Sequence, residues 1–176
     1  MAASMPALED WVRPGDVAWW WSLLAVGMGR TADMFSTWIG TPGLRNEGNP
    51  FARWLGWRKG ILLNVLAVPL AACWPMIAVS LATTSAMVAA RNLHTVWLMR
   101  MMGEDAYRDW FGGWMHATPR ILFLGCHWGE ALLTGGLGLA LVVLGPLHVL
   151  SFGIGVGFCA YGFAVAVFTT LAYFRR

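Results

Sequence analysis

Residues 17–40 form an apolar segment of membrane-spanning length, and this segment carries two charged residues near its middle. A helix needs about 20 apolar residues to cross the hydrocarbon core of a bilayer. A charge at the bilayer centre costs roughly 2.5–3.5 kcal/mol on insertion scales, so such residues usually face protein, water or a ligand. Arg30 and Asp33 therefore predict a membrane protein with several crossing helices and a specific polar contact in its interior.

The composition agrees with an integral membrane protein. Apolar residues make up 58% of the 176 residues and charged residues only 12%, which excludes a disordered chain. The apolar runs are long and continuous, which favours helices over the alternating pattern of a membrane β-barrel. Acidic Glu9, Asp10 and Asp16 stand where a cleavable signal peptide has a basic stretch. We expect an all-α polytopic transmembrane bundle that forms one domain over residues 1–176.

Four spans fit the apolar pattern best, and a fifth is left open. The expected spans cover residues about 17–40, about 60–85 with a helical extension to about 102, about 119–144 and about 147–173. An amphipathic segment over residues 104–118 lies between the second and third spans, and its aromatic and charged residues predict a helix on the membrane surface.

The stretch from residue 60 to residue 102 has two interpretations. As one helix it would measure roughly 60 Å, about twice the hydrocarbon thickness. Either it continues into the aqueous phase as a protruding helix, with Pro69 and Pro75 as kinks, or the chain turns near residues 80–85 and crosses a second time. We expect the protruding helix.

Basic residues predict the orientation of the chain. With four spans, the two termini and the segment 90–118 share one side, and this side holds more arginines than the other. The positive-inside rule then places both termini in the cytoplasm and the chain in the plasma (inner) membrane of a bacterium. The sequence also contains 12 tryptophans, several of them near the ends of the expected spans, where they anchor a helix in the lipid bilayer.

Polar side chains gather at one end of the first two spans. Arg30, Asp33 and Thr37 are spaced i, i+3 and i+7, so they share one face of a helix. The whole predicted cluster consists of Arg30, Asp33, Thr37, Glu47, Asn49, Lys59 and Asn64. Two interpretations stay open: a structural network of ion pairs and hydrogen bonds, or a polar pocket that binds an ion, a proton or a small molecule.

Part of this cluster resembles a known family. The pattern Asp33-x3-Thr37, then Glu47-x-Asn49-Pro50 and a basic residue opening the next span, is similar to small polytopic membrane proteins of bacteria and archaea whose function is uncharacterised. The resemblance covers roughly residues 30–65. Two consecutive threonines usually stand in that family where this chain has Ser36-Thr37, and the family lacks Arg30. The resemblance implies a class of membrane protein and no activity.

A second group of polar residues lies toward the other end of the chain. His127 and Glu130 share one helical face, and His94 lies in the extension of the second span. Histidine and carboxylate on adjacent turns is ligand spacing for a transition metal. A single haem, a chlorophyll-type pigment or a metal ion at these residues is one interpretation. The other is that His127 and Glu130 pair with each other or with polar neighbours, namely Arg91, Asn92 or Arg120.

The last two spans are rich in glycine. Gly125 and Gly129 lie four residues apart in the third span, and Gly153 and Gly157 do so in the fourth. Small residues at this spacing let two helices approach closely. There is more glycine than one hairpin needs, so we expect a neighbouring helix from another subunit or a flat cofactor.

These features favour a non-catalytic function. The sequence contains no nucleophile elbow, P-loop or dinucleotide-binding pattern, and its net charge of +3 gives no support for nucleic-acid binding. We expect an accessory or assembly subunit of a larger energy-transducing membrane complex, of respiratory or photosynthetic type. It would act through helix packing and through lipid or cofactor contacts. One alternative is an intramembrane binding or transport protein that uses the pocket around Arg30, Asp33 and Glu47. Another is a redox protein that holds a metal or a tetrapyrrole.

Overall fold

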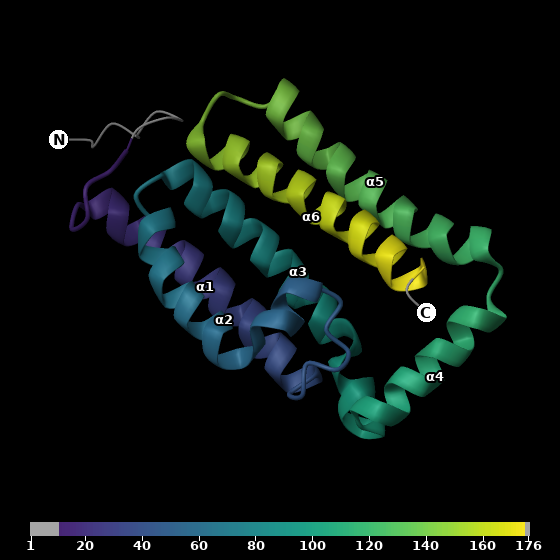
Figure 1. Cartoon of the computed structure of the whole chain (residues 1–176). Helices are drawn as coiled ribbons and strands as arrows, with labels where there is room; N and C mark the ends of the chain where they lie inside the picture. Colours follow the sequence, from purple (N-terminus) through teal and green to yellow (C-terminus); the bar gives the residue numbers. More distant parts are fainter. Residues whose placement is uncertain (1–10, 175–176) are drawn as a thin grey trace.

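The computed structural model describes residues 11–174, and these residues form six α-helices and no strand (Figure 1). The helices are α1 (Val17–Gly40), α2 (Pro50–Ala71), α3 (Pro75–Met102), α4 (Glu104–Ala117), α5 (Arg120–Leu144) and α6 (Val149–Phe174). The predicted all-α fold is confirmed. Three helices, α3, α5 and α6, are long and apolar enough to cross a membrane. Glu9, Asp10 and the two chain ends, on which the signal-peptide and orientation predictions rest, lie outside the described residues.

The chain turns between α2 and α3, so the prediction of one helix over residues 60–102 is wrong. The first helix ends at Ala71 and the next begins at Pro75. Proline lacks the N–H that a helix interior needs but fits the first helical turn, so Pro75 starts a new helix. Pro69 lies inside α2. The alternative of a turn near residues 80–85 is also wrong, because this segment lies within α3.

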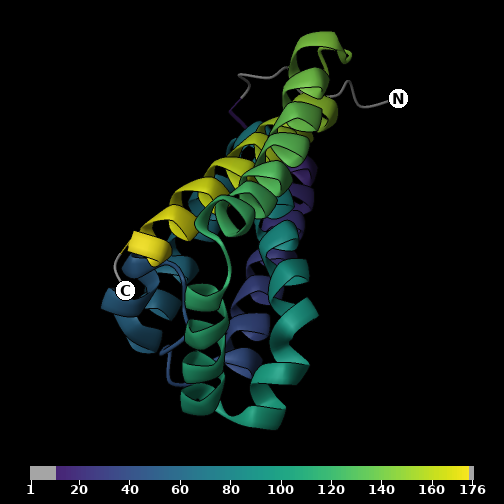
Figure 2. The same cartoon turned by 90° about the vertical axis from the view of Figure 1, so that its right-hand side faces the viewer.

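The five long helices, α1, α2, α3, α5 and α6, run in alternating directions (Figures 1 and 2). We call the end that holds the connections 72–74 and 145–148 the turn end, and the end that holds the loop 41–49 and α4 the loop end. The segment before α1 reaches the turn end, where Val12 N–H donates to the Cys73 carbonyl at 2.8 Å. The start of α1 and the end of α6 therefore lie at opposite ends of the bundle (Figure 1). The four-span prediction requires an even number of crossings and places both termini on one side, whereas the fifth span that was left open does not.

Helix α6 packs between α3 and α5, and α3 packs between α6 and α1. Glycine permits the closest of these approaches. A Cβ on Gly138 would lie 2.5 Å from the carbonyl oxygen of Gly155, and a Cβ on Gly155 would lie 2.8 Å from that of Gly138. The backbones of α5 and α6 are thus in contact at these positions. On the other side of the bundle, α2 has no buried residue, so it is a peripheral helix.

Helix α4 covers the residues predicted to form an amphipathic segment. It follows Gly103, whose φ of 83° lies in the region that favours glycine. This turn sends α4 across the loop end, crosswise to α3 (Figure 1). Tyr107 and Met115 are buried, whereas the neighbouring rings of Trp110 and Trp114 are exposed. The helix is amphipathic, and its position on a membrane surface stays a prediction.

Candidate functional site

The guanidinium of Arg30 is the centre of a polar cluster that joins three helices. Its Nη1 donates to Oδ2 of Asp33 at 2.7 Å and to Oγ of Ser85 in α3 at 3.2 Å, and its Nε donates to Oδ1 of Asn64 in α2 at 2.7 Å. Ser85 is 1% exposed, and the side chains of Arg30 and Asp33 are 27% and 16% exposed. Arginine keeps its charge in proteins, so a buried guanidinium needs such partners. We call these four residues the Arg30 cluster.

Thr37 takes part in a neighbouring contact between α1 and α3. Nδ2 of Asn92 donates to Oγ1 of Thr37 at 3.1 Å and lies 3.2 Å from Oγ of Ser36. Ser36 is 1% exposed and donates to the backbone carbonyl of Asp33 at 2.9 Å. Thr37 therefore bonds to α3 and lies about two helical turns from Arg30.

Glu47, in the loop between α1 and α2, interacts electrostatically with Asp33 of the Arg30 cluster. Burial raises the pKa of its carboxyl above the usual range, and the negative charge of Asp33 adds to the rise. The backbone N–H of Asn49, which donates to Oε1 at 2.8 Å, and the charge of Arg53 lower the pKa and oppose this effect. The negative charges of Asp33, on α1, and Glu47, in the loop, are therefore close enough to influence each other.

Two other predicted residues do not join the cluster. The side chain of Asn49 caps α2, because its Oδ1 accepts a hydrogen bond from the backbone N–H of Phe51 at 2.9 Å. Lys59 is exposed, and its ammonium lies 5.9 Å from the centroid of the Trp54 ring. The predicted set therefore separates into a cluster around Arg30, a helix cap and a surface cation.

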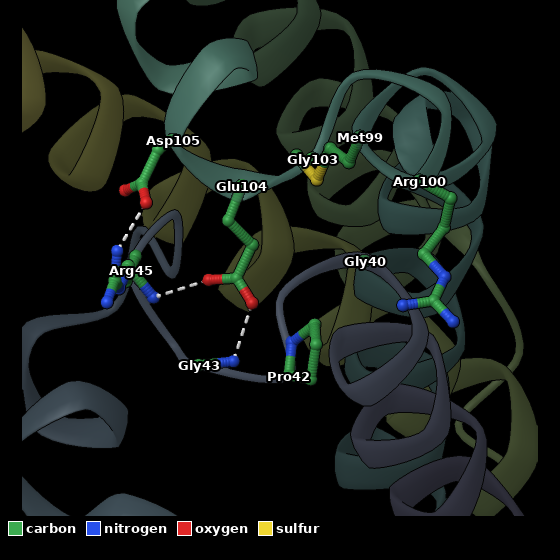
Figure 3. A pocket seen from close by; sticks show the side chains of 9 residues that line it. All are labelled: Gly40, Pro42, Gly43, Arg45, Met99, Arg100, Gly103, Glu104 and Asp105. Carbon is green, nitrogen blue, oxygen red and sulfur yellow. Dashed lines mark hydrogen bonds and ion pairs between the residues drawn. The ribbon is translucent and has the colours of Figure 1, made fainter.

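Glu104, at the start of α4, holds the loop that joins α1 to α2. Its carboxylate accepts hydrogen bonds from the backbone N–H of Gly43 at 2.6 Å and of Arg45 at 3.3 Å, and from Oγ1 of Thr41 at 3.1 Å. The guanidinium of Arg45 also pairs with Asp105 and lowers the pKa of that carboxyl. Gly43, Arg45, Glu104 and Asp105 line an open hollow of about 440 Å³, and Figure 3 shows them. Both oxygens of Glu104 have donors, so this acid has a structural role.

A second ion pair joins α3, α5 and α6. The hydroxyl of Tyr161 donates to Oε1 of Glu130 at 2.7 Å, and Nη1 of Arg91 lies 3.5 Å from the same oxygen. We call these three residues the Arg91 cluster. Tyr161 is 3% exposed, but the side chains of Arg91 and Glu130 are 34% and 38% exposed. Of the partners predicted for Glu130, the structure therefore shows Arg91. More than a third of each of these two side chains is exposed.

The histidines do not join this pair. Nδ1 of His127 lies 2.9 Å from the carbonyl oxygen of Phe123, and the two rings are 4.6 Å apart between centroids. His94 is exposed on α3. In residues 11–174, no group of three His, Cys, Asp or Glu side chains could hold a metal ion. His94, His127 and Glu130 are thus not brought together as metal ligands. A haem or pigment on a single histidine stays a prediction.

The two predicted glycine pairs have different surroundings. A Cβ on Gly153 would lie 2.9 Å from Cβ of Val79, and a Cβ on Gly157 would lie 2.6 Å from Cβ of Thr83. This pair therefore packs against α3. A Cβ on Gly125 or Gly129 would meet no atom within 4 Å. The glycine pair of α5 faces open space.

The sequence alone did not indicate Ser85 or Tyr161, and it suggested Asn92 as a partner of His127 or Glu130, whereas Asn92 bonds to α1. In a continuous helix, Asn64 and Ser85 would lie about 30 Å apart, because each residue adds about 1.5 Å. The turn at residues 72–74 folds them to the same depth, where both reach Arg30. Polar residues inside apolar helices do indicate buried polar contacts. Which residues contact each other can be assigned only once this turn is known.

Comparison of the chain with models of known protein families, with curated proteins and with solved structures finds no match.

Proposed function

We propose that this chain is a non-catalytic subunit of a larger membrane complex and that it packs the outer face of α5 against a helix of another subunit. The observation that carries the proposal is the contrast between the two glycine pairs. Gly153 and Gly157 lie against α3, whereas Gly125 and Gly129 have the same spacing and no neighbour within 4 Å of their Cβ positions. Glycines at this spacing in membrane helices favour close contact with another helix.

The Arg91 cluster supports the same proposal. Charged groups inside a membrane usually face protein or water, and the side chains of Arg91 and Glu130 are each more than a third exposed. A neighbouring helix on α5 would cover them. The predicted respiratory or photosynthetic type of the complex stays a prediction.

The Arg30 cluster gives less support to the alternative of a ligand pocket. Its hydrogen bonds are made between side chains of the chain itself. Among the described residues, no buried side-chain nitrogen or oxygen lacks a hydrogen-bond partner. These bonds join α1, α2 and α3, which is a structural role that needs no ligand.

We also propose that all five long helices cross the membrane. Because α3 starts at the turn end and α1 finishes at the loop end, α2 must run the length of the bundle between them (Figure 1). The exposed side chains of α2 suit lipid, since they include Ile61, Leu62, Leu63, Val65, Leu66 and Leu70.

The orientation follows from the basic residues. Those near the loop end are Arg45, Arg53, Arg58, Lys59, Arg100, Arg108 and Arg120, whereas Arg13 lies near the turn end. The positive-inside rule places the loop end in the cytoplasm. The end of α6 then lies on the cytoplasmic side, and the start of α1 lies on the opposite side because the number of crossings is odd.

The test compares three forms of the chain in native membranes: wild type, Gly129→Leu and Gly27→Leu. Gly27, on α1, is the matched control because its Cβ position is also open. After extraction in a mild detergent, size-exclusion chromatography with mass spectrometry gives the size and composition of the particle. Wild type and Gly27→Leu should elute in a large assembly with other proteins, and Gly129→Leu should elute as a small particle. A small particle for all three forms, or an unchanged assembly with Gly129→Leu, would contradict the proposal.

A further inference from the structure

The first residues of α2 form a separate short segment at the loop end. Gly56 has φ 67° and ψ 177°, which interrupts the helix between residues 50–55 and residues 57–71. In the short segment, Phe51 is 70% exposed and Trp54 is 78% exposed. Trp57 fixes the break, because its Nε1 donates to the carbonyl of Pro42 at 2.8 Å. Exposed aromatic rings at the end of a membrane helix are typical of the bilayer interface.

Three basic side chains accompany these rings. Arg53, Arg58 and Lys59 are all exposed. Within residues 11–174, the ion pairs of basic residues involve Arg30, Arg45, Arg91 and Arg108 and none of these three. Lys59 contacts the Trp54 ring, and Arg53 acts on the carboxyl of Glu47 without forming an ion pair. The segment therefore carries positive charge that the described chain does not neutralise.

We propose that residues 50–59 bind the headgroups of anionic phospholipids in the leaflet at the loop end. The phosphodiester of a headgroup is an acceptor for guanidinium and ammonium groups. Long basic side chains reach from the apolar part of a helix to the headgroup level, while Phe51 and Trp54 insert beside them. Each basic residue near an anionic membrane surface raises the affinity about fivefold. The inference uses the membrane orientation proposed above and is independent of the partner helix on α5.

The experiment measures lipid retention by the purified full chain in detergent. Equal amounts of phosphatidylglycerol and phosphatidylcholine with the same acyl chains are added, and native mass spectrometry gives the ratio of bound lipids. The test variant is Arg53→Gln/Arg58→Gln/Lys59→Gln. The control variant, Arg100→Gln/Arg108→Gln/Arg120→Gln, removes the same charge at the same end of the bundle. The single variants Arg58→Gln and Lys59→Gln cover the case in which the triple variant does not fold.

Wild type and the control variant should retain phosphatidylglycerol over phosphatidylcholine. The test variant should lower this ratio by at least about fivefold, the effect of one basic residue, and each single variant should give an intermediate ratio. An equal fall in both triple variants would show an effect of net charge alone and would overturn the proposal, as would an unchanged ratio in the test variant. Displacement of the lipid by excess inorganic phosphate would overturn it in favour of a phosphate site. Gly129→Leu should keep the wild-type ratio of bound lipids. Failure of the proposed helix contact on α5 is therefore distinguishable from failure of the lipid proposal.

Discussion

The Arg30 cluster and the Arg91 cluster each place an arginine and a carboxylate among apolar helices, but the first is less exposed. The side chains of Arg30 and Asp33 are 27% and 16% exposed, against 34% and 38% for Arg91 and Glu130. Arg30 also has two neutral acceptors besides its carboxylate, from α2 and α3. The first cluster has more partners within the chain and less exposed charge, whereas the second leaves more charged surface that another molecule can cover.

The two clusters also differ in where the carboxylate comes from. Asp33 lies on the same helix as Arg30, three residues away, so the helix itself brings the two side chains within reach of each other. Glu130 and Arg91 lie on different helices, on either side of α6. The first pair therefore forms within one helix, and the packing of α2 and α3 partly covers it. The second pair forms only when α3, α5 and α6 are assembled.

The largest effect is expected from Asp33→Ala. This change leaves the partly buried Arg30 without its carboxylate. Breaking one partner of a fully buried pair costs about 3–5 kcal/mol, so we expect a loss of about 3 kcal/mol for this pair, in which Arg30 is 27% exposed. Denaturant unfolding of the purified chain in detergent measures the loss. The double variant Arg30→Met/Asp33→Leu is the control, since it removes both charges and should recover most of the stability. A loss below about 1 kcal/mol for Asp33→Ala is what an exposed ion pair contributes, and it would contradict a larger contribution from the Arg30 cluster.

Ser85→Ala should have a smaller effect on the same cluster. It removes one acceptor of Arg30 and keeps Asp33 and Asn64 in place. We expect a loss of about 1 kcal/mol, the usual contribution of one hydrogen bond, in the same unfolding measurement. Ser80→Ala is a suitable control, because Ser80 Oγ bonds only to the Met76 carbonyl of its own helix in the described chain. Equal losses of stability for Ser85→Ala and Ser80→Ala would show that the hydrogen bond between Arg30 and Ser85 does not stabilise the fold.

Glu130→Gln should hardly change the stability of the isolated chain. Its amide oxygen still accepts from Tyr161, and the lost ion pair with Arg91 is open to solvent, so the expected cost is below about 1 kcal/mol. In native membranes, the same variant should reduce the fraction of the chain that elutes in the large assembly. A stability loss as large as that of Asp33→Ala, with an unchanged assembly, would show that the two clusters are alike.

Glu47→Gln should give the smallest effect, with a sign that depends on pH. The pKa of Glu47 is raised in the folded chain from its usual value of 4.5, so the folded state binds this proton more tightly than the unfolded state. The resulting stabilisation is present below that usual value and is lost as the pH rises through the raised pKa. Gln keeps the acceptor for the Asn49 N–H and stays neutral. Thermal unfolding should give Glu47→Gln a higher Tm than wild type at about pH 8 and a similar Tm at about pH 4. A difference that grows on acidification would have the wrong sign.

The sequence is sufficient to predict the all-α fold and the interior position of Arg30 and Asp33, because a charge in an apolar run needs a partner. It is not sufficient to predict the turn at residues 72–74. The run from 60 to 102 has no polar break, and Pro75 is compatible with a kink as well as with a helix start. The partners Ser85 and Asn92 depend on that turn, so they could not be assigned. Spacing likewise predicts close contacts at both glycine pairs, but which pair is filled depends on how α6 is rotated against α3.

Side-specific cysteine labelling tests the five crossings most directly. The native cysteines, Cys73, Cys126 and Cys159, are replaced by alanine, and a single cysteine is introduced as Gly48→Cys or as Leu147→Cys. Both positions are exposed, and they lie at the loop end and the turn end respectively. With four spans they would share one side of the membrane. Five crossings with a cytoplasmic loop end predict that an impermeant maleimide labels Leu147→Cys in intact cells and reaches Gly48→Cys only after lysis. Labelling of both positions in intact cells would contradict this arrangement.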